Sequence, residues 1–208
     1  MAAGCVESDP SNTSGLRVRC PWAEGPWLRR YHDREWGVPV HQERGLFELL
    51  VLEGAQAGLS WLTVLKRRDG YRVAFADFDP VQVAGFDSAQ VEALLSQPGI
   101  IRHRQKVEAA ISNAAALLRI REEAGSFDEF IWGFVEGKPL RNRWANQEEV
   151  PATTPLARRV SAELRERGFR FVGPTICYSF LQAAGLVLDH LTSCFRYAEL
   201  GGGRPGPP

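Results

Sequence analysis

Two pairs of metal-binding residues lie near opposite ends of this chain of 208 residues. Cys20 and His32 are near the start, and His190 and Cys194 are near the end. If the second pair lies on a helix, one turn brings both side chains to the same face. Two cysteines and two histidines together suit tetrahedral zinc. Such an ion would hold the two ends together and close most of the chain into one loop.

Protein would fill all four positions of that zinc, which leaves no place for a reactive water and predicts a structural ion. An alternative stays open, because four Cys and four His in a chain of this size can be unrelated. Cys177 lies in an apolar run and is expected in the core, and Cys5 is expected to be a free thiol. Cysteines this sparse, without a signal peptide, favour a reducing cytoplasmic setting.

The length predicts one globular domain or two small lobes that share an interface. A hydrophobic fraction of 44% is enough for a substantial core, and no apolar run is long enough to span a bilayer. Segments 1–17 and 199–208 are rich in small residues and proline. They are expected to be a disordered N-terminal tail and a flexible C-terminal tail around an ordered domain, 18–198.

Between the tails, apolar residues recur mainly with the helical period, and few stretches alternate with period two. A mainly α fold is therefore predicted. One long apolar helical segment is expected over 46–65, interrupted by Gly54 and Gly58. Further helices are expected over 91–95, which Ser88 could cap, and over 107–118, 127–135, 156–167 and 176–191.

A Pro-Gly turn joins two of these helices and is followed by basic residues. Pro98 ends the first helix, and Gly99 lets the backbone turn tightly and approach another molecule. Arg102, Arg104 and Lys106 then lie around the start of the second helix, whose free N–H groups and nearby cations make an anion site. The phosphate of a nucleic-acid backbone is the obvious anion. A Pro-Gly turn is also common as plain architecture, and the net charge of zero gives no sign of polyanion binding.

Glu53 lies in an apolar segment, and aromatic residues are dense near the start of the chain. If the helix continues, Glu53 and Trp61 share one face. A buried carboxylate needs a partner, so Glu53 either reaches solvent or a helix N-terminus, or pairs with a bound cation or a donor-rich ligand. Tyr31 directly precedes His32, and aromatic rings stack on nucleobases and attract cations. A pocket of Tyr31, Trp61 and Glu53 would favour a positively charged base.

Four segments are long and unusual enough to identify a resemblance. They are Cys-Pro-Trp at 20–22, Tyr-His-Asp-Arg-Glu-Trp-Gly-Val-Pro at 31–39, Leu-Glu-Gly-Ala-Gln-Ala-Gly-Leu-Ser-Trp at 52–61 and Gly-Phe-Arg-Phe-Val-Gly-Pro-Thr-Ile-Cys-Tyr-Ser-Phe at 168–180. These resemble the bacterial 3-methyladenine DNA glycosylase I family, and the similarity runs from about Arg19 to Tyr197. The turn and its helices, around 88–118, resemble the helix-hairpin-helix element of the wider DNA glycosylase superfamily, which grips the DNA backbone without reading bases.

The resemblance implies a helix-hairpin-helix DNA glycosylase-like fold of two helical lobes, with the N- and C-terminal segments joined by one zinc ion. It also assigns the site residues. The zinc ligands would be Cys20, His32, His190 and Cys194. In the base pocket, Glu53 is also the catalytic candidate, Tyr31 and Trp61 would lie against the ring, and Trp22 and Trp36 would lie around it. The DNA contacts would be Gly99, Arg102, Arg104 and Lys106.

By this resemblance, the protein is a monofunctional enzyme of base-excision repair, expected to act as a monomer. It would hydrolyse the N-glycosidic bond of N3-methyladenine in alkylated double-stranded DNA, release 3-methyladenine and leave an abasic site. Alkylation at N3 makes the base cationic and a good leaving group, so little acid catalysis is needed. The family lacks the catalytic Asp of its relatives, so Asp128 and Glu129 are expected to be helix-start residues only.

Three other classes of function fit parts of the sequence. A non-catalytic helix-hairpin-helix DNA-binding module with structural zinc explains the hairpin but gives no reason for Glu53 among aromatics. A zinc hydrolase or nucleobase deaminase needs an open metal position and motifs that this sequence lacks. A bifunctional glycosylase would cleave the strand through a lysine Schiff base, but Lys106, the only lysine near the hairpin, is expected to contact phosphate.

Overall fold

The computed structural model describes residues 17–201 and 204–205, and this part of the chain is mainly helical, as predicted. Its α-helices are α1 (Gly25–Arg34), α2 (Glu43–Gln56), α3 (Trp61–Leu65), α4 (Arg68–Ala74), α5 (Pro80–Ala84), α6 (Ser88–Ser96), α7 (Arg104–Ala124), α8 (Phe127–Gly133), α9 (Pro155–Glu166), α10 (Pro174–Ala183) and α11 (Phe195–Glu199). Within these residues, no helix has both the length and the apolarity that a bilayer crossing requires. Cys5 and the predicted N-terminal tail, except Arg17, lie outside the described residues.

Two 3₁₀ helices and three short strands complete the described elements. The 3₁₀ helices are η1 (Ala76–Phe78) and η2 (Gln147–Glu149), and the strands are β1 (Leu140–Arg141), β2 (Val187–Leu188) and β3 (Arg204–Pro205). β1 lies between β2 and β3 and pairs with both in parallel. Part of the segment expected to be a flexible C-terminal tail therefore takes part in this small sheet.

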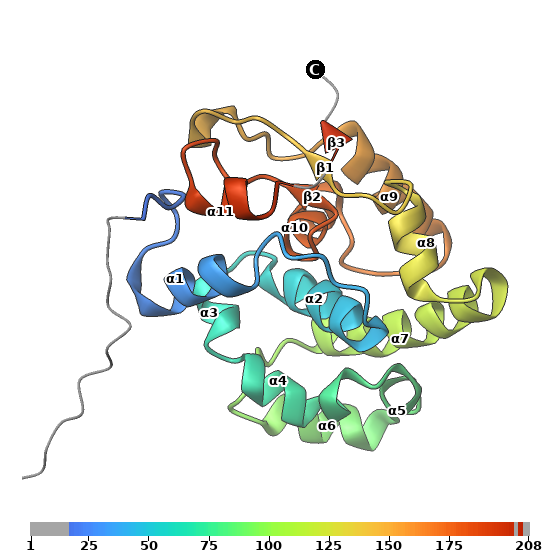
Figure 1. The fold of residues 1–208 in the computed structure, drawn as a ribbon. Coiled ribbons are helices and arrows are strands. Elements are labelled where there is room, and N and C mark those ends of the chain that lie inside the picture. Colours follow the sequence, from blue (N-terminus) through green and yellow to red (C-terminus); the bar gives the residue numbers. More distant parts are fainter. Residues whose placement is uncertain (1–16, 202–203, 206–208) are drawn as a thin grey trace, which may run out of the picture.

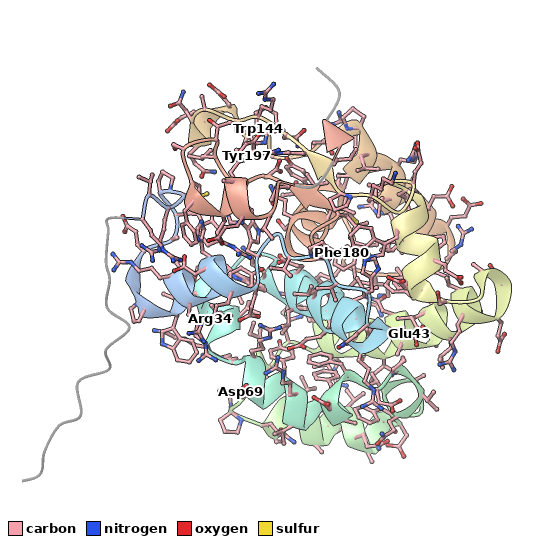
Figure 2. All side chains as sticks on the ribbon, in the orientation of Figure 1. Arg34, Glu43, Asp69, Trp144, Phe180 and Tyr197 are labelled. Atoms are coloured by element: carbon pink, nitrogen blue, oxygen red, sulfur yellow. The ribbon has the colours of Figure 1, made fainter. Side chains whose placement is uncertain are left out.

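Helices α2 and α7 run through the middle of the fold. In Figure 1, α4, α5 and α6 lie on one side of α2, and α10 with the strands lies on the other. α5 and α6 pack on α7, while α10 packs on both α2 and α9. Phe47 of α2 and Phe180 of α10 are fully buried, and Figure 2 shows Phe180 near the centre of the molecule. Each buried side chain of this size stabilises the fold by about 1.5–3 kcal/mol.

The two ends of the ordered chain lie next to each other. Figure 1 shows the blue segment before α1 beside the red segment around α11. The Phe195 N–H donates to the Val18 carbonyl at 3.0 Å. The guanidinium groups of Arg17 and Arg19 lie over the Phe195 ring, at 4.9 and 5.6 Å from its centre. The chain thus closes on itself where the Cys and His spacing predicts.

The structure corrects the prediction of one helical segment over 46–65. α2 ends at Gln56, Gly58 has a φ of +77°, and α3 begins at Trp61. A left-handed residue of this kind stops a helix, and glycine adopts that conformation without strain. Glu53 and Trp61 therefore do not share a helix face, and a loop rather than helical spacing sets their relative position.

The prediction of a helix over 176–191 is wrong at its C-terminal end. α10 ends at Ala183, and Gly185 follows with a φ of +74°. A Cβ at that glycine would lie 2.5 Å from the backbone of the segment before α2, so a side chain has no room there. His190 and Cys194 therefore lie in a loop after β2 and do not share a helical face.

The predicted cap of α6 is also wrong by one residue. Asp87, not Ser88, is the N-cap, because its carboxylate accepts the Gln90 N–H while the Gln90 side chain accepts the Asp87 N–H. This reciprocal pair is a capping box, and it satisfies two backbone donors that would otherwise be free.

The turn between α6 and α7 packs closely against α4. A Cβ on Gly70 of α4 would overlap the backbone of Gly99 in the turn. The neighbouring Tyr71 hydroxyl accepts the Ile101 N–H at 3.3 Å. The shape of the turn is therefore set by contact with another helix as well as by its own Pro-Gly sequence.

We expect Gly70→Ala to lower the free energy of unfolding by about 1–3 kcal/mol, because the added methyl group meets rigid backbone and forces a local shift. Thermal denaturation followed by circular dichroism would show this as a lower Tm. The matched control is Gly133→Ala at the end of α8, where an added Cβ has nothing within 4 Å. Equal Tm values for the two variants would contradict the close contact.

Candidate metal centre and adjacent pocket

Cys20, His32, His190 and Cys194 meet in one buried cluster, and their ligand atoms all lie within 4.8 Å of one another. The Cys194 sulfur is 3.4 Å from His32 Nε2 and 3.6 Å from His190 Nδ1. The Cys20 sulfur is 3.7 Å from His190 Nδ1. Around a tetrahedral ion with bonds of about 2.3 Å to sulfur and 2.0 Å to nitrogen, these atoms would be about 3.5 Å apart. The cluster therefore has the dimensions to hold a metal ion.

Both histidine rings are oriented by a partner on the nitrogen that faces away from the cluster. His32 Nδ1 is 2.8 Å from an Asp33 carboxylate oxygen, and His190 Nε2 is 3.0 Å from the Trp36 carbonyl oxygen. Metal-bound histidines usually donate their second N–H in this way, which fixes the tautomer. Arg19 in turn pairs with Asp33 at 2.8 Å. These outer contacts, like the four candidate ligands themselves, are those expected of a metal site.

The two thiols of the cluster differ in acidity. The hydrogen bond from Cys20 lowers the pKa of Cys194, and contacts with His190 and His32 add to this. The pKa of Cys20 is raised by the same contact and by burial. The cluster therefore favours one thiolate, which is the form of cysteine that binds a metal.

A cavity of about 500 Å³ lies beside this cluster. It is lined by all five residues predicted for the base pocket, namely Trp22, Tyr31, Trp36, Glu53 and Trp61. The cluster and the cavity share a wall, because the Trp22 ring lies 5.2 Å from the His32 ring and the Trp36 ring lies 4.5 Å from the His190 ring. The chain fold thus brings the predicted residues together, with α1 supplying one wall and α2 and α3 another.

Glu53 is a buried carboxylic acid on the wall of this cavity. Its side chain is only 4% exposed, which excludes the alternative that it reaches solvent. Burial raises the pKa of its carboxyl to about 8, because a charged group is disfavoured away from water. Two further polar groups of the cavity, the Tyr31 hydroxyl and Trp61 Nε1, are buried without a hydrogen-bond partner.

The Tyr31 and Trp61 rings lie 5.2 Å apart at an angle of 52°. An unpaired buried polar group costs about 1–3 kcal/mol. The unpaired Tyr31 hydroxyl and Trp61 Nε1 therefore lower the stability of the protein when no ligand is bound. A ligand that supplies partners would recover that energy. The cavity is therefore suited to a flat, polar ligand that carries positive charge and hydrogen-bonding groups.

Asp189 is a second buried carboxylate on the cavity wall, and it is not among the residues predicted for the pocket. One oxygen accepts from Asn142 Nδ2 and Trp144 Nε1, both at 2.7 Å. The other accepts from Gln182 Nε2 at 2.7 Å and from the Tyr178 hydroxyl. This network ties the segment that carries His190 and Cys194 to α10. The signal in the sequence was slight: a single acidic residue directly before a metal-ligand candidate.

The residues predicted to contact DNA lie at and just after the turn between α6 and α7. Arg102 is exposed there. Arg104 is also exposed and pairs with Glu92 at 2.6 Å. Gly99 packs on α4. The Lys106 ammonium instead donates to two backbone carbonyls near the end of α2, at 2.8 and 2.6 Å.

Asp128 and Glu129 are not among the residues that line the cavity. Asp128 lies 3.0 Å from His41 Nδ1, and the Ser126 hydroxyl donates to Glu129 at 3.1 Å. Both acids lie in the first turn of α8, where negative charge interacts favourably with the helix dipole. Their contacts agree with the expected role at the start of a helix.

Comparison with known proteins assigns the family. Residues 22–197 match the methyladenine glycosylase family. The chain is 48% identical over 180 residues to DNA-3-methyladenine glycosylase 1 of Escherichia coli (strain K12), an alignment that covers 86% of this chain and 96% of that protein. It is 45% identical over 180 residues to DNA-3-methyladenine glycosylase of Haemophilus influenzae (strain ATCC 51907 / DSM 11121 / KW20 / Rd), with 86% and 97% covered.

A solved structure gives the same result for the fold. The 3-methyladenine DNA glycosylase I of Staphylococcus aureus superposes with a TM-score of 0.83 at 39% identity, over 85% of this chain and 95% of that one. Sequence and structure together show that the chain belongs to the methyladenine glycosylase family, which confirms the resemblance seen in its motifs.

We expect the Glu53 carboxyl to make stability depend on pH. Because its pKa is raised from 4.5 to about 8 in the fold, the folded state binds this proton more tightly than the unfolded state does. The resulting stabilisation is complete below pH 4.5 and is lost as the pH rises through about 8. Glu53→Gln is neutral at every pH and should lack this component.

Urea denaturation of both proteins between about pH 5 and pH 9 measures the effect. The free energy of unfolding of the wild-type protein should fall relative to that of Glu53→Gln across this range. A difference that stays constant with pH would contradict the buried, unpaired state of the carboxyl.

Proposed function

We propose that the protein is a DNA-3-methyladenine glycosylase that hydrolyses the N-glycosidic bond of N3-methyladenine in alkylated double-stranded DNA. The observation that carries this proposal is an aromatic cavity in which the buried polar groups of Tyr31 and Trp61 lack partners next to the buried acid Glu53. The curated relatives carry the same activity in their names, and the S. aureus neighbour is described as recognising 3-methyladenine.

The pocket favours a cationic purine over a neutral one. Methylation at N3 gives adenine a positive charge while it is attached to the sugar. A cation beside Glu53 favours the ionised carboxylate and so lowers its pKa from about 8. The π faces of Tyr31 and Trp61 would attract the same charge, and Trp22 and Trp36 would surround the base. A neutral purine keeps the ring contacts but lacks the attraction of its charge to Glu53 and to the π faces, so the pocket discriminates by charge.

The reaction needs little help with the leaving group. The bond between sugar C1′ and the base nitrogen breaks, and its electron pair stays with the base, which leaves as neutral 3-methyladenine. A water oxygen bonds to C1′ and one proton is released, so the products are the free base and an abasic site. Glu53 acts electrostatically: it holds the cationic base and then faces the positive charge that passes to the sugar.

The metal cluster is proposed to hold one structural zinc ion, with Cys20 and Cys194 as thiolates and His32 Nε2 and His190 Nδ1 as nitrogen ligands. Two sulfur and two nitrogen ligands complete a tetrahedral site and leave no position for a reactive water. A bound ion would fix the two ends of the chain and, with them, Tyr31 beside the pocket. Cysteines kept as thiolates need a reducing compartment, so we place the protein in the cytoplasm.

The α6–α7 pair, around 88–118, is proposed to be a helix-hairpin-helix element that binds the DNA backbone. α7 begins without a side-chain cap, so no side chain occupies the N–H groups of its first two residues, Arg104 and Gln105, which could meet a phosphate. Arg102 and Arg104 are exposed beside them. Such contacts position the enzyme without reading sequence, and they offset the few kcal/mol that extrusion of the base costs. One chain would act on one lesion as a monomer.

We expect the wild-type protein to release 3-methyladenine from methylated duplex DNA, with the free base identified by chromatography. Glu53→Gln should lower the single-turnover rate by about 100-fold, because it removes the negative charge from the pocket. Asp128→Asn serves as the matched control, since it changes an acid outside the pocket in the same way, and it should cleave at the wild-type rate. Binding to DNA without release of any base would instead indicate a non-catalytic DNA-binding module.

A further inference from the structure

The end of α2 next to the pocket is capped from another helix. The last turn of α2 holds no basic residue, and its C-cap, Ala57, has φ −47° and ψ 116°. Carbonyls at the end of a helix carry partial negative charge and need donors. Lys106 of α7 supplies them, because its ammonium nitrogen lies 2.8 Å from the Ala55 oxygen and 2.6 Å from the Ala57 oxygen.

The side chain of Lys106 is half-buried and committed to these contacts. It lines a small space together with Gly54 and Phe171, and burial lowers the pKa of its ammonium group. An ammonium group has three N–H donors, and two of them are used here. To reach a phosphate with the same donors, the group would have to leave two carbonyls unpaired.

The carbonyls that Lys106 holds lie at the start of a loop that forms part of the pocket. Gln56 and Ser60, on either side of residues 57–59, both line the cavity, as does Trp61 directly after them. The position of Trp61 against Tyr31 therefore depends on where this loop begins. Since the last turn of α2 offers no cation, Lys106 is the charged group that fixes that point.

We propose that Lys106 is a positioning residue that holds the loop after α2 and thereby shapes the pocket at Trp61, rather than a contact to DNA phosphate. Lys106 lies in the first turn of α7. The helix that follows the proposed DNA-binding turn therefore also supports the pocket loop. The inference rests on the proposed function, because the pocket it shapes is the proposed site of the methylated base.

Binding of free 3-methyladenine separates the two roles of Lys106, since no phosphate is present in that experiment. Lys106→Met should weaken binding by about tenfold, or about 1.4 kcal/mol, in a tryptophan-fluorescence titration. Lys138→Met makes the same change at an exposed lysine that does not line the cavity, and it should bind as the wild type does. Equal affinity of Lys106→Met and wild type would overturn the inference. Absence of binding by the wild type would overturn the proposed function instead.

The salt dependence of binding to undamaged duplex DNA gives a second test. Each lost phosphate contact reduces the slope of log K against log salt concentration by about 0.9. Lys106→Met should keep the wild-type slope, whereas Arg102→Met, in the exposed turn, should reduce it. A reduced slope for Lys106→Met would show that its ammonium group binds phosphate and would overturn the inference.

A measurement on the wild-type protein keeps the inference testable even if Lys106→Met does not fold. The chain has three lysines, Lys66, Lys106 and Lys138, so the ¹⁵N ammonium signals can be assigned with Lys66→Met and Lys138→Met. The Lys106 signal should exchange slowly with water, because two of its donors are bonded to carbonyls, and it should not move when undamaged duplex DNA is added. Fast exchange, or a shift at the Lys106 signal on DNA binding, would contradict the positioning role.

Discussion

The contact between the two Cys-His pairs is the constraint on which the pocket depends. It joins Cys20 near the start of the chain to Cys194 near its end, and it lies directly behind the cavity. Tyr31 directly precedes His32 and Asp189 directly precedes His190, so the geometry of the cluster carries over to two pocket side chains. Trp22 contacts the His32 ring, Trp36 contacts the His190 ring, and both tryptophans line the cavity. Part of the pocket lining is thus built on the joined chain ends, and α2 and α3 supply another part, with Glu53 and Trp61.

The two carboxylates of the pocket show how the same chemical group serves two purposes. Asp189 accepts four side-chain donors and stabilises the wall. Glu53 is buried with a raised pKa, and the neighbouring Tyr31 hydroxyl and Trp61 Nε1 are unpaired. A fold selected for stability alone would pair these groups. Their burial without partners is therefore the cost of a site that is completed by a charged, planar ligand.

Much of this site follows from residue types that the sequence displays. Helical periodicity predicts the mainly α fold, and the Cys and His spacing predicts which four residues meet. A shared helix does not bring His190 and Cys194 together, because α10 ends before Gly185 and both residues lie in the loop that follows β2. Asp189 could not be foreseen, because donors such as Asn142 lie 47 positions away. The contact of Lys106 with α2 could not be foreseen either, since it spans about 50 residues and follows no periodic pattern.

The most direct test of this account measures metal content and base binding on the same samples. Wild-type protein should contain about one zinc per chain. Cys194→Ser should lose the zinc and, with it, the affinity for free 3-methyladenine. Cys177→Ser, which alters a buried cysteine outside the cluster, should keep both. If Cys194→Ser were free of zinc and still bound the base with wild-type affinity, the joined chain ends would not be what shapes the pocket.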